Sequence, residues 1–164
     1  MATAAKEETP HIGIDKAGRT KAGKELGKVL ADSYTLYLKT HNFHWNVRGP
    51  HFHALHNLFE EQYTELAMAV DAIAERIRAL GVDAPGSYRQ FDGLNSIEEA
   101  PDTPPPALEM AATLAHDHEA VAKTCRAAMQ VAEENEDEVS VDMMVQRMTV
   151  HDKAAWMLRA IAAE

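Results

Sequence analysis

Residues 52–80 read FHALHNLFEEQYTELAMAVDAIAERIRAL, and this stretch decides the fold. Apolar residues recur in it at spacings of four and three, at Leu66, Val70, Ile73, Ile77 and Leu80. This spacing places them on one face of an α-helix, so it predicts a long helix that packs this face against a core. Gly81 follows directly, and a glycine just past the last periodic residue is typical of a helix end.

Apolar spacing of the same kind predicts further long helices at about residues 20–47, 106–133 and 140–162. The break at Gly49-Pro50 is short, so the first two helices should form an antiparallel pair. Residues 81–105 are rich in Pro and Gly, with room for a short helix near residues 88–91. A connector of this length lets the third helix run parallel to the second. The prediction is an all-α four-helix bundle whose long crossover carries a short helix.

Length and composition predict one bundle domain at residues 20–164, preceded by a flexible, weakly basic tail at residues 1–19. The net charge is −10, although residues 1–24 carry five Lys or Arg against three Asp or Glu. An acidic body favours cations over nucleic acid as partners. The single cysteine, Cys125, excludes an intrachain disulfide and is expected to be buried. Without a long apolar run or a signal-peptide pattern, we expect a cytoplasmic protein that has no membrane partner.

Two pairs of potential metal ligands lie on the helix predicted for residues 52–80. His56 and Glu60 form one pair and Asp71 and Glu75 the other, each with a spacing of four. At about 100° per residue, the four side chains fall within roughly 100° of one another, beside the apolar stripe. A surface helix commonly carries such acidic pairs in contact with solvent, so the spacing alone leaves a metal site and a solvated face both open.

The separation of the pairs points to two chains. At about 1.5 Å per residue, Glu60 and Asp71 are roughly 16 Å apart along the helix axis, so one metal ion cannot bind both. A second copy of the helix, antiparallel and related by a two-fold axis near Glu65 and Leu66, would complete two identical sites. His44 should lie at the height of His56 across the hairpin, and mixed His and carboxylate ligands suit iron.

A metal site could also form within a single chain, from Glu-x-x-His motifs on two helices of the bundle. The one such motif in the chain, Glu8 to His11, contains Pro10 and lies in the predicted tail. The sequence therefore excludes this kind of single-chain site.

Four segments together resemble the Dps family, the mini-ferritins that protect DNA in starved or oxidatively stressed bacteria. The segments are KTHNFHWNVRGPHF (residues 39–52), LHNLFEE (55–61), DAIAER (71–76) and HDKAAWMLR (151–159). The resemblance covers roughly residues 25–162. It implies a ferritin-like bundle that assembles into a hollow dodecameric shell. It also implies a ferroxidase with a two-metal iron site, which oxidises Fe(II) at two-fold interfaces with hydrogen peroxide or oxygen and stores the ferric mineral.

The resemblance also assigns individual residues. The family's iron ligands fall on His44, His56, Glu60, Asp71 and Glu75, although many members have Asp in place of Glu60. Trp45 matches a tryptophan thought to intercept radicals near the iron, and interface packing is an equal alternative for it. The pores that admit iron along three-fold axes would be lined by Glu133, Glu138 and Asp142, which could equally form a charged helix–helix turn.

The remaining residues and functions leave alternatives open. Other histidines are expected to be surface or hydrogen-bonded residues, with an accessory metal site as the minority reading: His41, His51, His53, His116 and His118. The methionines are expected to fill the core. The functional alternative to an iron store is a DNA-compacting nucleoid protein with a vestigial metal site. Twelve weakly basic N-terminal tails acting together could bind DNA at low salt.

Overall fold

The computed structural model describes residues 9–163, and over this range the regular structure is entirely helical. Four long helices are α1 (Lys16–Asn46), α2 (Phe52–Ala79), α4 (Ala107–Glu134) and α5 (Glu138–Ala162). A short helix, α3 (Tyr88–Asp92), lies in the connector between α2 and α4. The predicted all-α bundle with one long crossover is confirmed.

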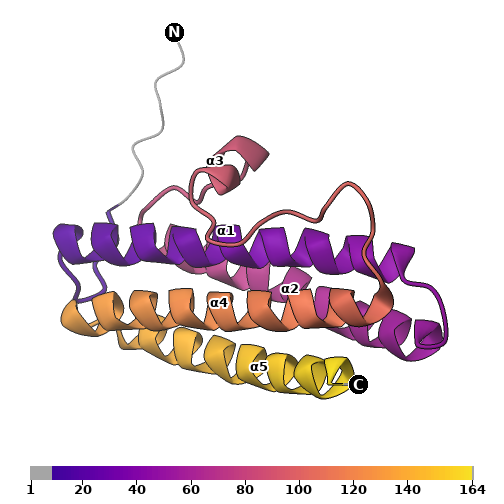
Figure 1. The fold of residues 1–164 in the computed structure, drawn as a ribbon. Helices are drawn as coiled ribbons and strands as arrows, with labels where there is room; N and C mark the ends of the chain where they lie inside the picture. Colours follow the sequence, from indigo (N-terminus) through magenta and orange to yellow (C-terminus); the bar gives the residue numbers. More distant parts are fainter. Residues whose placement is uncertain (1–8, 164) are drawn as a thin grey trace, which may run out of the picture.

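Figure 1 shows how the connector sets the direction of α4. The connector runs the length of the bundle alongside α1, carries α3, and returns the chain to the end at which α2 begins. The α4 helix therefore runs parallel to α2 and antiparallel to α1 and α5. Buried Asp32 of α1 fixes the connector, accepting hydrogen bonds from the Ser96 amide (2.5 Å), the Ser96 hydroxyl (2.8 Å) and the Thr124 hydroxyl (2.6 Å).

Two helices begin earlier than predicted, in both cases at an aspartate cap. The Asp15 carboxylate accepts a hydrogen bond from the Gly18 amide (2.7 Å), so α1 begins at Lys16 and residues 16–19 are helical. Asp137 accepts from the Ser140 amide (3.1 Å), and α5 therefore begins at Glu138. Such caps satisfy amides that the first turn leaves unpaired. Residues 1–8 of the predicted tail lie outside the described residues.

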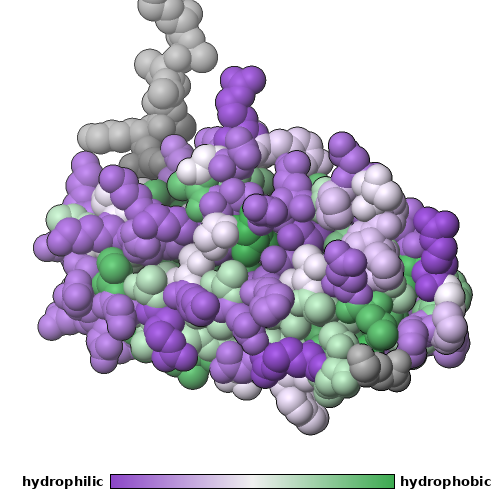
Figure 2. Space-filling view, in the orientation of Figure 1, coloured by the Kyte–Doolittle hydropathy of each residue, from purple (hydrophilic) through white to green (hydrophobic). Residues whose placement is uncertain are grey.

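The core consists of apolar side chains from all four long helices. Its largest fully buried members include Phe43 of α1, Phe59 and Ile73 of α2, and Leu114 of α4. Cys125 is also buried, as expected, and burial raises the pKa of its thiol to about 12. The face over α4 and α5 in Figure 2 is mostly hydrophilic, with scattered apolar patches. None of the described helices is long and apolar enough to span a membrane.

Buried charged residues join the helices across this core. Lys39 of α1 donates to Asp117 of α4 (2.7 Å), and Arg76 of α2 donates to Asp137 at the start of α5 (2.5 Å). Arg147 of α5 forms two hydrogen bonds with Glu65 of α2. Each pair holds together helices that are distant in the sequence, and pairing offsets part of the cost of removing these charges from water.

Candidate metal centre

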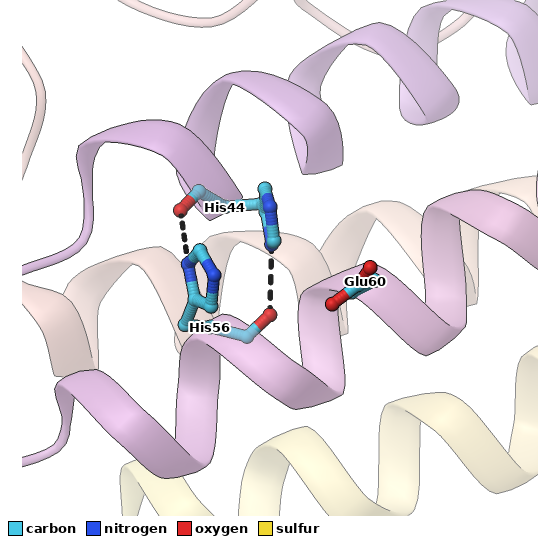
Figure 3. Close-up of side chains that lie close together, drawn as sticks. All are labelled: His44, His56 and Glu60. Atoms are coloured by element: carbon cyan, nitrogen blue, oxygen red, sulfur yellow. Dashed lines mark hydrogen bonds between the residues drawn. The ribbon is translucent and has the colours of Figure 1, made fainter.

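Three predicted ligands meet where α1 and α2 are joined by the tight turn. His44 lies in the last turn of α1, and His56 and Glu60 lie in the first turns of α2. One potential ligand atom from each residue lies within 4.8 Å of those of the other two. Figure 3 shows the two imidazoles side by side, with Glu60 one helical turn further along α2. The hairpin thus brings together the half-site that the sequence predicted.

Each histidine is held by the backbone of the other helix. Nδ1 of His44 lies 2.8 Å from the His56 carbonyl oxygen, and Nδ1 of His56 lies 2.9 Å from the His44 carbonyl oxygen. Because a carbonyl oxygen only accepts, both Nδ1 atoms must donate, and each neutral ring then presents an unprotonated Nε2. The rings stack with centroids 3.8 Å apart. Both imidazoles are therefore fixed in the tautomer that binds a metal through Nε2.

Aromatic rings pack around this half-site. His41, one helical turn before His44, lies between the rings of Tyr63 (centroids 4.1 Å apart) and Trp45 (4.0 Å). Tyr63 also meets the His44 ring edge-on. Burial and the neighbouring His44 lower the pKa of His41. Trp45 contacts His41 while keeping 61% of its surface exposed, so the indole lies beside the half-site.

Asp71 and Glu75 lie on the exposed side of α2, away from the other three residues. Within residues 9–163, His44, His56 and Glu60 are the one group of three or more His, Cys, Asp or Glu side chains close enough to share a metal. Leu66 faces the core, as the apolar spacing predicted. On the outward side, between the two ligand pairs, the helix carries Met68, which is 66% exposed.

The three residues predicted for a pore gather at one end of the bundle. Glu133 lies in the last turn of α4, and Glu138 and Asp142 lie one helical turn apart near the start of α5. All three are exposed, and the Gln146 amide donates to Asp142 (2.6 Å). One chain therefore presents several carboxylates at this end, and a ring of them would need further copies.

A buried cluster that the sequence did not indicate joins α4 and α5. Nδ1 of His118 and Nδ1 of His151 are 2.9 Å apart, and Arg147 donates to Nε2 of His151 (3.2 Å). Because Nε2 of His151 accepts, its Nδ1 must donate to His118. Burial, assisted by the Arg147 charge, lowers the pKa of His118 to about 3. Burial also lowers the pKa of His151 well below its ordinary value, with His118 and Arg147 as further causes.

Comparison with known proteins agrees with this architecture. The sequence model for the ferritin-like domain matches residues 23–164. "DNA protection during starvation protein 2" of Bacillus anthracis is 39% identical over 82% of this chain and 92% of its own length.

Solved structures agree as well. The crystal structure of Dps from Staphylococcus aureus is 35% identical, covers 87% of this chain and 95% of its own, and superposes with a TM-score of 0.83. A Dps from Vibrio cholerae, described as a member of a broad superfamily of ferritin-like diiron-carboxylate proteins, is 27% identical and covers 95% and 98%, with a TM-score of 0.87. The chain is a member of the Dps family within the ferritin-like superfamily.

Proposed function

We propose that this protein oxidises Fe(II) and stores the ferric product, and that it thereby protects DNA from oxidative damage. Two iron ions, which are the substrate, are held by His44, His56 and Glu60 of one chain together with Asp71 and Glu75 of its two-fold mate. Hydrogen peroxide is the preferred oxidant and oxygen is the alternative. Twelve chains form the hollow shell that retains the mineral.

The observation that carries this proposal is the pair of reciprocal hydrogen bonds between His44 and His56. They engage both Nδ1 atoms and leave the Nε2 lone pairs available, and one ring nitrogen of each histidine lies within 4.8 Å of a Glu60 carboxylate oxygen. Two imidazoles and a carboxylate suit Fe(II), and added carboxylates favour Fe(III). This ligand set therefore supports a site that binds Fe(II) and then stabilises the Fe(III) formed from it.

The need for a second chain follows from the exposed face of α2. Three ligands leave positions open, while Asp71 and Glu75 offer exposed carboxylates roughly 16 Å along the same helix. An antiparallel copy of α2 would bring these carboxylates to the partner's half-site, and exposed Met68 between the two pairs would become an apolar contact. The two-fold arrangement is thus supported by ligands and by packing.

The redox balance needs two electrons for each peroxide. Two Fe(II) ions supply one electron each and become Fe(III), and the peroxide takes up two protons to give two water molecules. Removing peroxide and Fe(II) together prevents their one-electron reaction, which produces the radicals that damage DNA. We further propose that Glu133, Glu138 and Asp142 form carboxylate rings that attract Fe(II) at three-fold pores.

Paired variants in a mixed assembly test the shared site. One variant carries His44→Ala and Glu60→Gln, and the other carries Asp71→Asn and Glu75→Gln. Each alone should lose rapid Fe(II) oxidation by peroxide. Refolding or coexpressing them together should recover about a quarter of the wild-type activity, because half of the dimers would be mixed and each would regain one of two sites. An absence of recovery in an assembled mixed protein would refute the shared site.

DNA binding is tested separately from iron oxidation. The relatives named for DNA protection could act through their iron chemistry or through contact with DNA, and the sequence offers a weakly basic tail for contact. Residues 16–24 belong to α1, so the truncation should remove only residues 1–8. A mobility shift in moderate salt that disappears on this truncation, in a variant lacking His44 and Glu60, would favour the DNA-compacting alternative.

A further inference from the structure

The end of the bundle opposite the metal centre contains a buried cation without a counter-charge. Three cationic residues are buried among residues 9–163: Arg19, Lys39 and Arg147. Lys39 pairs with Asp117 and Arg147 pairs with Glu65. Arg19 is 5% exposed and has no carboxylate partner within the described chain. A guanidinium removed from water is normally paired with an anion, so we expect an anion to bind beside Arg19.

The hydrogen bonding of Arg19 is also incomplete. Nη1 donates to the carbonyl oxygen of Pro10 (2.6 Å), which is a neutral acceptor. The buried Nε has no partner among the described residues. Arginine offers donors in a planar fork that matches the oxygens of carboxylates and phosphates. A neutral backbone oxygen therefore holds one end of that fork, while the positive charge has no anionic partner among the described residues.

Arg19 lines a pocket of about 270 Å³. Lys16 and Thr20 of α1, Arg78 of α2 and Thr9 also line it. Arg78 donates to Asp83 (2.6 Å), so its charge is compensated locally, whereas exposed Lys16 adds a positive charge beside that of Arg19. The Asp15 carboxylate is engaged in capping α1 and is absent from the lining. The Thr20 hydroxyl donates to the Lys16 carbonyl oxygen (2.8 Å), which leaves that of Thr9. The pocket combines positive charge with this hydroxyl group, which suits an oxyanion.

A glycine fixes one wall of this pocket. Gly81, just after α2, has a φ of +77°, and a side chain there would start 2.9 Å from Cδ of Pro10. Pro10 thereby packs directly on the end of α2 while its carbonyl oxygen holds Arg19. Because α1 and α2 are joined at their other ends by the turn next to the metal centre, the pocket lies about 40 Å from His44 along α1.

We propose that this pocket binds a phosphate group through Arg19 and Lys16. A phosphate supplies the counter-charge that Arg19 lacks, and the ammonium group of Lys16 and the hydroxyl group of Thr9 can donate to its oxygens. The group could be inorganic phosphate or a phosphodiester of the DNA backbone, which offer the same oxygens. The site is independent of iron oxidation, and its test does not use that activity.

Binding of inorganic phosphate to the full-length assembly, followed by calorimetry and by thermal unfolding, tests the site. Sodium chloride at equal ionic strength is the reference. Phosphate should bind saturably and raise the unfolding temperature of the wild type. Arg19→Gln should weaken binding about tenfold or more, because a charge-assisted hydrogen bond is lost. Lys16→Gln should weaken it about two- to fivefold.

Lys24→Gln is the matched control, because Lys24 is an exposed cation of α1 that does not line the pocket. It should bind phosphate like the wild type. If Arg19→Gln fails to fold, comparison of Lys16→Gln with Lys24→Gln still decides the question. Equal effects of phosphate and chloride on the wild type, or equal binding by the two lysine variants, would overturn the proposal.

Duplex DNA distinguishes the two sources of phosphate. If the pocket takes the DNA backbone, Lys16→Gln should weaken a mobility shift more than Lys24→Gln does, and inorganic phosphate should compete. If the pocket takes free phosphate, both lysine variants should shift DNA equally while differing in phosphate binding. Both results support the site and identify its ligand. Removing residues 1–8 in parallel separates this pocket from the N-terminal tail.

Discussion

At the scale of single residues, the position of a proton decides what the metal centre can bind. Nδ1 of His44 and of His56 donates to a backbone carbonyl of the opposite helix, which leaves Nε2 as the ligand atom on both rings. Glu60 supplies the negative charge. A glutamate reaches one methylene further than an aspartate, so the carboxylate rather than its exact reach should be essential.

Substitution of Glu60 tests this view. Glu60→Gln keeps the shape but removes the charge, and it should weaken the binding of Co(II), used as a spectroscopic probe for Fe(II), by at least about tenfold. Glu60→Asp should retain binding close to that of the wild type. Titration followed by visible absorption of bound Co(II) measures both. Equal affinities of the Gln variant and the wild type would remove Glu60 from the ligand set.

At the scale of helices, charged and polar residues hold α2, α4 and α5 in register. Arg147 of α5 is bound to Glu65 of α2, and its side chain is only 8% exposed. Glu65→Gln should lower the free energy of unfolding by about 2 kcal/mol, because it leaves a largely buried guanidinium without its counter-charge. Urea unfolding of the assembled protein measures the change. Glu25→Gln, which breaks the exposed Glu25–Lys28 pair, should cost about 0.5 kcal/mol or less.

The buried histidines between α4 and α5 make stability depend on pH. The folded-state pKa of His118 is about 3, against an ordinary value of 6.5, so only the unfolded chain takes up this proton in mild acid. The contribution of neutral His118 to the free energy of unfolding is fully present above the ordinary pKa of 6.5 and is lost as pH falls toward 3. Between about pH 7 and 5 this amounts to about 2 kcal/mol for His118, and His151 should add to it.

His118→Gln should therefore flatten the dependence of unfolding free energy on pH. The comparison is made by urea unfolding at several pH values on the assembled protein. His116→Gln is the control, because the His116 side chain lies on the same helix and is 80% exposed. Parallel pH curves for the wild type and His118→Gln would show that the buried pair does not cause the acid sensitivity.

How far the sequence predicts these features depends on the range of the interactions. The face of α2 follows from the spacing of Leu66, Ile73 and Ile77, and the meeting of His44, His56 and Glu60 follows from a short turn between two helices. The start of α1 was missed because a single capping carboxylate, that of Asp15, decides it. The pairing of His118 with His151 was also missed, since it depends on how α4 and α5 pack.

At the scale of the whole molecule, the bundle leaves apolar surface that a single chain does not cover. Met68 is 66% exposed on the side of α2 that carries the ligand pairs. If this side is the two-fold interface, a charge at its centre should separate the dimers by opposing burial against an identical surface. The iron site would then be lost although all five proposed ligands remain.

Met68→Lys should accordingly reduce the assembly to smaller species in light scattering and remove rapid Fe(II) oxidation. Met68→Leu is the matched control, because it keeps an apolar side chain of similar volume, and it should retain both assembly and activity. Circular dichroism verifies that the variant chain remains helical. A fully assembled and active Met68→Lys protein would place the interface on another face of the molecule.

The reciprocal hydrogen bonds of His44 and His56 also connect metal affinity to local opening of the chain. The end of α1 cannot separate from the start of α2 without releasing both imidazoles from their carbonyl partners. A metal ion bound by both histidines should therefore oppose the separation of α1 from α2 at this end of the hairpin. Amide hydrogen exchange in the first turns of α2 should slow in proportion to metal saturation, while exchange at the far end of the hairpin should stay unchanged.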